Sequence, residues 1–276
     1  MAITNIPILS LGAGVQSSTM ALMYACGELS PMPQCAIFAD TGDEPQAVYE
    51  WLNWIETKLP YPIHRVQKGI LSVDSLRVRV SAKTGKSYTK SQPPAYMQMP
   101  DGAPSGLLMR QCTMTHKLDP IYSACWKIYC AERKKNPGVS VKIKMLIGIS
   151  IDEIIRMKPS TRPYVENVFP LIDAQMRRSD CLAWMKNHGF PEPPRSACVY
   201  CPFHSNEEWL RIKAIPAEWN KAVEYEKALQ ASLKQVDRYD GTAYLHPSLV
   251  PLADVDFSKG TSLPLFGNEC EGMCGV

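Results

Sequence analysis

The sequence predicts an α/β protein built on a doubly wound, mostly parallel sheet. Three observations support this prediction. Short apolar runs without polar alternation recur along the chain, as in strands that are covered on both faces. Segments with helical spacing lie between these runs. Glycine-rich or polar motifs follow several of the runs directly, at the place where the carboxyl ends of parallel strands meet to bind ligands.

Composition narrows the class of protein. The chain has 276 residues, 45% of them hydrophobic and 21% charged, which suits one large domain or a domain with an appendage. The net charge of +3 is too mild to indicate a nucleic-acid binder by itself. No apolar run reaches the length of a membrane span, and the start lacks a signal-peptide pattern, so we expect a soluble, cytoplasmic protein without a membrane partner. In a reducing compartment, ten cysteines favour metal or thiol chemistry over disulfides.

The first motif spans residues 8–18 and reads as a buried strand, a glycine-rich turn and the start of a helix that runs to Cys26. Two glycines two positions apart let the backbone approach a ligand closely. The positive end of the following helix favours an anion, and serine hydroxyls add donors for phosphate oxygens. An ordinary strand-to-helix turn is the alternative interpretation. The candidate nucleotide-binding residues here are Ser10, Gly12, Gly14, Gln16, Ser17 and Ser18.

The second apolar run, residues 34–40, ends in Asp40 and Thr41. These side chains should lie at the carboxyl edge of the sheet, beside the first loop. Asp43 offers a different explanation of the polar cluster, because it could cap a helix expected over residues 45–58 that has a proline in its first turn. A third strand is expected over residues 62–66.

A basic segment without acidic residues follows the third strand. It carries Arg77, Arg79, Lys83, Lys86 and Lys90. We favour a solvated, mobile loop, since prolines and glycines continue to Gly106. The alternative is a clamp on a polynucleotide backbone, for which Tyr88 and Tyr96 would offer stacking surfaces.

Two further motifs bring functional side chains. Cys112 precedes Lys117 by five residues, before a helix expected over residues 121–133. A strand over residues 143–148 leads into Gly148, after which two carboxylates suit a magnesium ion or a ribose hydroxyl. Guanidinium groups pair with phosphate, although a local salt bridge at a helix start is an alternative. The candidates after this strand are Gly148, Asp152, Glu153, Arg156 and Arg162.

The strongest local signal is the Cys198-Val-Tyr-Cys201 pair. Ser205 and Glu208 form a capping-box pattern, so a helix should begin just after the cysteines, and its positive end favours thiolates. We rank an iron–sulfur cluster first, a structural zinc site second and a redox dithiol third. The candidate metal ligands are Cys112, Cys181, Cys198 and Cys201. If Cys181 is not a ligand, one iron of a four-iron cluster has no protein ligand.

These motifs, in this order, resemble those of the PP-loop superfamily of adenine nucleotide alpha-hydrolase-like proteins, in the branch that is similar to phosphoadenosine phosphosulfate reductases and DndC-like proteins. The matching elements are Ser-Leu-Gly-Ala-Gly-Val-Gln-Ser-Ser from Ser10, Phe-Ala-Asp-Thr-Gly from Phe38, the Cys112-to-Lys117 segment with Pro120, and Gly-Ile-Ser-Ile-Asp-Glu from Gly148. Ala13, Gln16 and Ser150 depart from the usual pattern.

The resemblance implies a PP-loop nucleotide-binding domain with the cysteine cluster over residues 1–204, followed by a helical segment and tail over residues 205–276. It implies ATP, Mg²⁺ and a 4Fe-4S cluster as cofactors, with zinc as the alternative metal. The expected reaction is sulfur transfer with adenylation of an acceptor, which we expect to be a nucleic acid, and release of pyrophosphate. A cysteine desulfurase type of protein is an expected partner. Oligomeric state is left open. Asp40 and Thr41 would border the nucleotide, Lys117 would face phosphate, and Asp152 would act at the reacting triphosphate.

The tail of the chain carries Cys270 and Cys274. It is similar to the Glu-Cys-Gly tail of phosphoadenosine phosphosulfate reductase, so both thiols are catalytic candidates. A metal ligand or an inert tail are equal alternatives. The sequence therefore also allows a thiol-dependent sulfonucleotide reductase that uses Cys270, or a non-catalytic nucleotide or nucleic-acid binding module.

Overall fold

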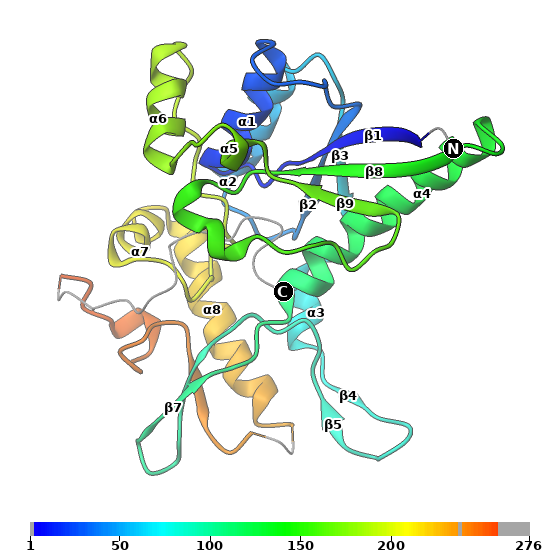
Figure 1. Cartoon of the computed structure of the whole chain (residues 1–276). Coiled ribbons are helices and arrows are strands. Elements are labelled where there is room, and N and C mark those ends of the chain that lie inside the picture. Colours follow the sequence, from blue (N-terminus) through cyan, green and yellow to red (C-terminus); the bar gives the residue numbers. More distant parts are fainter. Residues whose placement is uncertain (1–2, 237–238, 259–276) are drawn as a thin grey trace.

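The computed structural model describes residues 3–236 and 239–258. Its centre is a sheet of five parallel strands in the order β3-β2-β1-β8-β9. The strands are β1 (Ile3–Ser10), β2 (Cys35–Asp40), β3 (Ile63–Gln67), β8 (Ser140–Ile147) and β9 (Val165–Val168). Figure 1 shows helices above and below this sheet. The doubly wound, parallel α/β fold predicted from the sequence is confirmed.

Alternate residues of the strands face two separate cores. Leu9 and Phe38 pack beneath helices on one face, whereas Ile8 and Ile37 pack against helix α4 on the other. This double coverage explains why the strands read as continuous apolar runs. The helices on the first face are α1 (Val15–Ala25), α2 (Gln46–Glu56), α5 (Pro170–Asp173) and α6 (Arg178–Asn187), and α4 is Asp119–Lys135.

A third core lies below the sheet in Figure 1 and is formed by later parts of the chain. Trp209 is fully buried there, and Trp219 packs against the same cluster. The helical region predicted from residue 206 is present as two helices that separate before Pro216. These elements are α7 (Asn206–Lys213), α8 (Pro216–Leu233), the short helix α3 (Leu71–Leu76), strand β10 (Thr242–Tyr244) and the 3₁₀ turn η3 (Leu252–Asp254).

The segment between α3 and Cys112 contains four short strands where the sequence predicts a loop. One antiparallel hairpin carries most of the basic residues, and the other joins β10 in a three-stranded sheet. Backbone pairing therefore fixes a segment whose composition is typical of a loop. The strands are β4 (Arg79–Val80), β5 (Ser87–Tyr88), β6 (Tyr96–Gln98) and β7 (Pro104–Leu107).

Two short helical segments that are not α-helical flank the sheet edge. A π-helical turn, η1 (Thr113–Leu118), leads into α4, and a 3₁₀ segment, η2 (Ile151–Arg156), follows β8. Both lie near the carboxyl edge of the sheet. The candidate binding residues predicted from the sequence gather at this edge. Within the described residues, no helix combines the length and apolar character that a membrane span needs.

Candidate functional site

The loop after β1 places an uncapped helix end at the centre of the carboxyl edge. Ala13 adopts a left-handed conformation with φ of 60°. The Gly12 N–H donates to Ser17 Oγ at 3.2 Å, and Ser17 Oγ donates to the Gly14 carbonyl at 3.4 Å. Gly14 begins α1, and no side chain caps it. The first turn of α1 therefore keeps the positive end that suits an anion.

The other hydroxyls of this motif have different neighbours. Ser10 is the last residue of β1 and stands opposite Ile147 in the sheet register. Ser18 Oγ accepts a hydrogen bond from the Trp51 indole N–H at 2.9 Å, so it joins α1 to α2 inside the first core. Ser18 thus has a packing role in the structure, whereas Gly12, Gly14 and Ser17 form the turn itself.

Gly148 lets the end of β8 touch the first turn of α1. A Cβ at Gly148 would lie 2.8 Å from both the N and the Cα of Ser17. Gln16 lies in the same contact. It is fully buried, and its Nε2 donates to Ser150 Oγ at 3.4 Å and to Glu153 Oε2 at 3.2 Å.

No hydrogen bond to Gln16 Oε1 comes from the part of the chain that the structure describes. This buried amide oxygen lies where β1, β8 and η2 meet, and it could still accept a hydrogen bond there.

The charged residues after β8 are largely engaged with one another. Arg156 forms an ion pair with Glu153. Asp152 accepts the Arg178 N–H through both of its oxygens at 3.1 Å, so it caps the start of α6. Arg162 lies over the Tyr122 ring at 5.4 Å. The structure thus brings Gln16, Glu153 and Arg156 together, whereas Asp152 and Arg162 contact other elements.

The end of β2 forms the adjacent part of the edge. Asp40 Oδ1 accepts from the Gly42 N–H at 2.7 Å and from the Tyr49 hydroxyl at 2.9 Å. Burial and this carboxylate raise the pKa of Tyr49. Thr41 Oγ1 lies 3.3 Å from Cys198 Sγ and donates to Glu44 Oε1 at 3.2 Å. Thr41 therefore connects the strand end directly to the cysteine pair.

Asp43 does not cap α2. The helix begins after Pro45 without a side-chain cap. The Asp43 carboxylate instead accepts from Ser72 and from the Tyr200 hydroxyl, because it points away from the helix end. The local capping interpretation of this residue is wrong.

Three cysteines converge on one small cavity. Cys112, Cys198 and Cys201 line an enclosed space of about 20 Å³, enough for one water molecule. Lys117, Arg110 and Thr41 line it as well. Cys112 and Lys117 reach the same cavity because the i→i+5 bonding of a π-helix aligns residues five positions apart. The five-residue spacing seen in the sequence thus has a geometric cause.

The backbone around the Cys-x-x-Cys pair is held at several points. The Cys198 carbonyl accepts from the Cys201 N–H at 2.9 Å and from His204 Nε2 at 3.0 Å. The Val199 N–H donates to the Asp43 carbonyl at 3.0 Å. The Ser205 hydroxyl accepts the Glu208 N–H at 3.3 Å and begins α7, as the capping pattern predicts. These bonds hold both thiols on a rigid turn.

Burial and charge act in opposite directions on the Cys198 thiol. Desolvation and the Glu44 carboxylate raise its pKa, while Lys117 and the Thr41 hydroxyl lower it. The Lys117 ammonium lies 3.5 Å from Glu44 Oε1, and both side chains are buried. A bound cation or metal cluster would favour the thiolate strongly in such a place.

The cavity brings thiols and cations together, but its volume of about 20 Å³ accommodates a water molecule and not a metal cluster. Three thiols share a cavity with the cations of Lys117 and Arg110, which would offset the negative charge of a thiolate-ligated cluster. Within residues 3–236 and 239–258, no group of three or more His, Cys, Asp or Glu side chains is arranged around one metal-ion position.

The structure places Cys181 apart from these three cysteines. It is fully buried in the first core, on the face of α6 that packs against α1, and the Thr19 hydroxyl donates to its carbonyl at 3.5 Å. Cys112 and Cys198 belong to the third core instead. Cys270 and Cys274 lie outside the described residues.

Sequence reasoning missed two residues of the cavity region. Glu44 pairs with Lys117, and Arg110 lines the cavity two positions before Cys112. A charged residue so close to a motif cysteine is a usable signal in the sequence. Glu44 carries no such signal, because its contact with Lys117 spans 73 positions of the chain.

Comparison with known proteins finds similarity to solved structures over part of the chain. No protein-family model and no curated protein matches this chain. Among solved structures, phosphoadenylyl-sulfate (PAPS) reductase from Candida auris, in complex with phosphate, is similar at 14% sequence identity and a TM-score of 0.39. The match covers 68% of this chain and 74% of that chain.

Proposed function

We propose that this chain catalyses ATP-dependent sulfur transfer, in which an acceptor is adenylated with release of pyrophosphate, assisted by an iron–sulfur cluster. One observation supports this most directly. Three cysteines and Lys117 line a cavity together with Thr41, which follows β2, and β2 pairs with β1, whose loop leads to the uncapped N-terminus of α1. The proposed phosphate and sulfur sites would then lie at the ends of neighbouring strands.

In this proposal the turn of Gly12 to Ser17 receives the phosphates of ATP through main-chain N–H groups. Mg²⁺ commonly binds through one or two carboxylates together with substrate phosphates. Glu153 is the carboxylate we assign to it, since Asp152 is engaged with α6. Arg156, paired with Glu153, supplies positive charge as pyrophosphate leaves.

The reaction balances as two substitutions. An acceptor oxygen attacks the α-phosphorus of ATP, and the bond to pyrophosphate breaks. A sulfide nucleophile then attacks the activated carbon, the carbon–oxygen bond breaks, and AMP leaves with the oxygen. The Lys117 ammonium holds negative charge at the thiol cavity during the second step.

Cys112, Cys198 and Cys201 would hold the cluster. When bound with three protein ligands, such a cluster supplies an iron that has an open coordination position for sulfur. Cys181, which is buried in a different core, has no part in this assignment.

The test is anaerobic purification followed by quantification of iron, sulfide and zinc and an absorption spectrum. We expect an iron–sulfur protein that keeps its iron in Cys181→Ala and loses it in Cys198→Ala. Both substitutions remove a buried thiol, so Cys181→Ala is the matched control for packing loss. Wild-type protein that contains stoichiometric zinc, or no metal, would contradict the proposal.

A second assay follows pyrophosphate release from ATP in the presence of candidate acceptors. The sulfonucleotide reductase alternative predicts no pyrophosphate and a strict requirement for Cys270. Reduction of phosphoadenosine phosphosulfate that is abolished in Cys270→Ser would therefore replace the proposed function.

A further inference from the structure

A second, larger pocket lies outside the cysteine cavity and is open to solvent. Its volume is about 780 Å³, and it lies between the ends of β3 and α3, the strand β4, and the segment that leads into η1. Four cations line it, together with two carboxylates. The cations are Lys68, Arg79, Lys90 and Arg110, and the carboxylates are Asp74 and Asp119.

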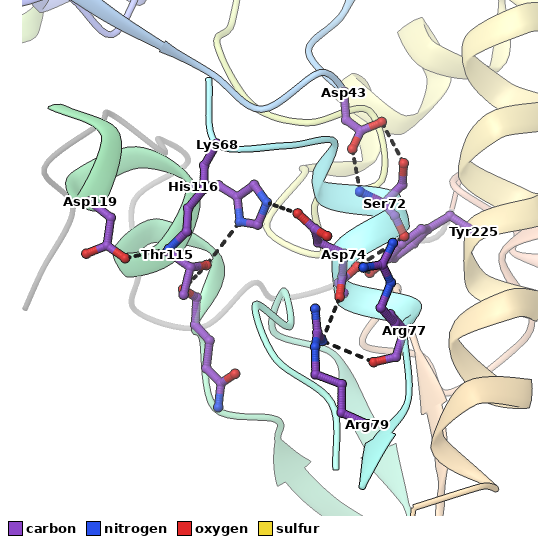
Figure 2. Close-up of polar contacts among 12 residues, drawn as sticks. Asp43, Lys68, Ser72, Asp74, Arg77, Arg79, Thr115, His116, Asp119 and Tyr225 are labelled. Carbon is purple, nitrogen blue, oxygen red and sulfur yellow. Dashed lines mark hydrogen bonds and ion pairs between the residues drawn. The ribbon is translucent and has the colours of Figure 1, made fainter. Parts of the chain in front are cut away.

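Both carboxylates are already engaged within the pocket wall. Lys68 Nζ lies 2.8 Å from Asp119 Oδ2, and His116 Nε2 lies 3.1 Å from Asp74 Oδ2 (Figure 2). The Thr115 hydroxyl contacts His116 Nδ1 at 3.0 Å. The acidic side chains therefore brace the wall and leave the pocket with an excess of positive charge.

Two cations have no acidic partner. The Arg79 guanidinium donates to the main-chain carbonyls of Asp74 and Arg77 at 3.4 and 3.2 Å (Figure 2). The Lys90 ammonium lies over the Tyr88 ring at 5.9 Å. In the described part of the chain no carboxylate forms an ion pair with either group. Their charge remains available to a ligand.

The positive surface continues past the pocket. The β4–β5 hairpin that carries Arg79 projects from the body of the protein, and its turn holds Lys83 and Lys86, both exposed (Figure 1). From Arg77 to Lys90 the chain has five basic residues and no acidic one. A row of cations of this length suits a polyanion with evenly spaced charges better than a single phosphate group.

The pocket also offers apolar surface of the kind that bases stack on. Met109 is 73% exposed and Met114 is 41% exposed at its rim. Tyr88 lies beside the Lys90 ammonium. Phosphate contacts combined with aromatic stacking platforms are typical of proteins that hold single-stranded nucleic acid, and the Tyr88 ring is such a platform.

The two cavities share one wall. Arg110 lines both of them. On η1, Lys117 faces the cysteine cavity, while Met114, Thr115 and His116 face the basic pocket. Arg110 and η1 therefore separate a chain bound in the pocket from the thiols.

We propose that the basic pocket and the β4–β5 hairpin bind the phosphodiester backbone of a single-stranded polynucleotide and bring one of its bases toward the cysteine cavity. This inference rests on the proposed function, because it identifies the acceptor of that reaction. The pocket supplies affinity through charge, and Arg110 marks the path by which the reacting base passes to the thiols.

The experiment measures binding of fluorescently labelled single-stranded RNA and DNA oligonucleotides by anisotropy over a range of salt concentrations. We expect wild-type affinity to fall linearly with salt on logarithmic axes. Arg79→Ala with Lys90→Ala should weaken binding at least tenfold and lower the salt slope by about 1.4, which is two phosphate contacts at roughly 0.7 each. Lys90→Glu alone should also weaken binding. Lys90 is exposed, and this substitution leaves the hydrogen bonds of Arg79 in place.

The matched control removes two exposed cations from α4, Lys127→Ala with Lys134→Ala, and should stay within twofold of wild type. Equal losses in both double variants, or a wild type that binds neither oligonucleotide, would overturn the inference. Binding of either RNA or DNA supports the inference, and the polymer that binds with the higher affinity is identified as the acceptor.

Iron content and ATP binding are measured on the same preparations. A protein that holds iron and ATP and binds no oligonucleotide refutes the pocket assignment alone. A protein that binds oligonucleotide through Arg79 and Lys90 without iron refutes the proposed function alone.

Discussion

Gly148 occupies a position where space, and not backbone conformation, requires glycine. A methyl group there would meet the main chain of Ser17 and Gln16, at 2.8 and 3.1 Å, and main-chain atoms cannot rotate away. We expect Gly148→Ala to lower the free energy of unfolding by about 1–3 kcal/mol, in the range of other overpacked sites. Relieving this clash would displace the first turn of α1, so ATP binding should also weaken. Urea denaturation and a nucleotide titration measure the two effects.

Ala13→Gly is the matched control in the same loop. Ala13 carries its methyl at a positive φ, which costs about 1–2 kcal/mol, while the buried methyl contributes about 0.8 kcal/mol. These contributions oppose each other, so stability should change by no more than about 1 kcal/mol. Equal stability of Gly148→Ala and wild type would show that β8 and α1 can separate without cost.

The cysteines show which individual site residues can be predicted from the sequence and which cannot. The Cys198 and Cys201 pair is evident because both sulfurs lie on one local turn. Four cysteines qualified as ligands, and only packing separates them: Cys112 lines the cavity, whereas Cys181 is buried between α1 and α6. Contacts that span more than 80 positions decide this, and no local pattern carries such information.

At the scale of elements, prediction succeeded where burial is continuous. β2 and the carboxyl-terminal parts of β1 and β8 are buried on both faces, and the N-terminal ends of α7 and α8 follow from the Ser205 cap and Pro216. The four strands between Arg79 and Leu107 were missed, because each has only two to four residues and polar neighbours. The π-helical geometry of η1 was missed as well, since it depends on how Cys112 and Lys117 pack.

A buried histidine connects α7 to the segment after β10, and from it we predict that stability depends on pH. His246 Nδ1 accepts from the Ser248 hydroxyl at 2.7 Å and the Ser248 N–H at 3.2 Å, so His246 Nε2–H donates to Asn206 Oδ1 at 3.1 Å. Burial lowers the pKa of His246 below its usual 6.5. The unfolded chain therefore takes up a proton first as pH falls below about 6.5. The contribution of His246 to stability should fall by up to about 1.4 kcal/mol per pH unit until the native imidazole also titrates.

The measurement is urea denaturation of wild type and His246→Gln between pH 7.5 and 5. The variant should lose less stability over this range, since one group with a lowered pKa is absent. Ser248→Ala removes a donor to Nδ1, which eases protonation, so its pH dependence should lie between the two. A slope in His246→Gln identical to that of wild type would contradict the assignment of the neutral ring.

At the scale of the whole molecule, Asp43 connects the parallel sheet to the third core. Its carboxylate is fully buried and binds three other segments. It accepts from the Ser72 N–H and the Tyr200 hydroxyl, each at 2.6 Å, and pairs with Lys221 Nζ at 2.7 Å. Figure 2 shows its contact with α3. One side chain thereby joins the end of β2 to α3, to the cysteine turn and to α8.

Removing this carboxylate should affect both halves of the structure. We expect Asp43→Ala to cost about 1–3 kcal/mol, because the buried Tyr200 hydroxyl loses its acceptor, while the ion pair with the partly exposed Lys221 contributes little. Asp43→Asn should also be destabilised, since an amide nitrogen cannot accept from Ser72 or Tyr200. Urea denaturation reports the loss, and Asp240→Asn, at an exposed position, should unfold like wild type.

The cysteine turn provides a second readout of the same change. Val199 N–H donates to the Asp43 carbonyl, and Tyr200 binds the carboxylate, so a variant at this position should release the turn before the sheet unfolds. We expect Cys198 and Cys201 in Asp43→Asn to react faster with a thiol reagent at denaturant concentrations where helix content is still native. Thiol reactivity that rises only together with the loss of helix would mean that the turn is held by other contacts and that Asp43 does not couple the two regions.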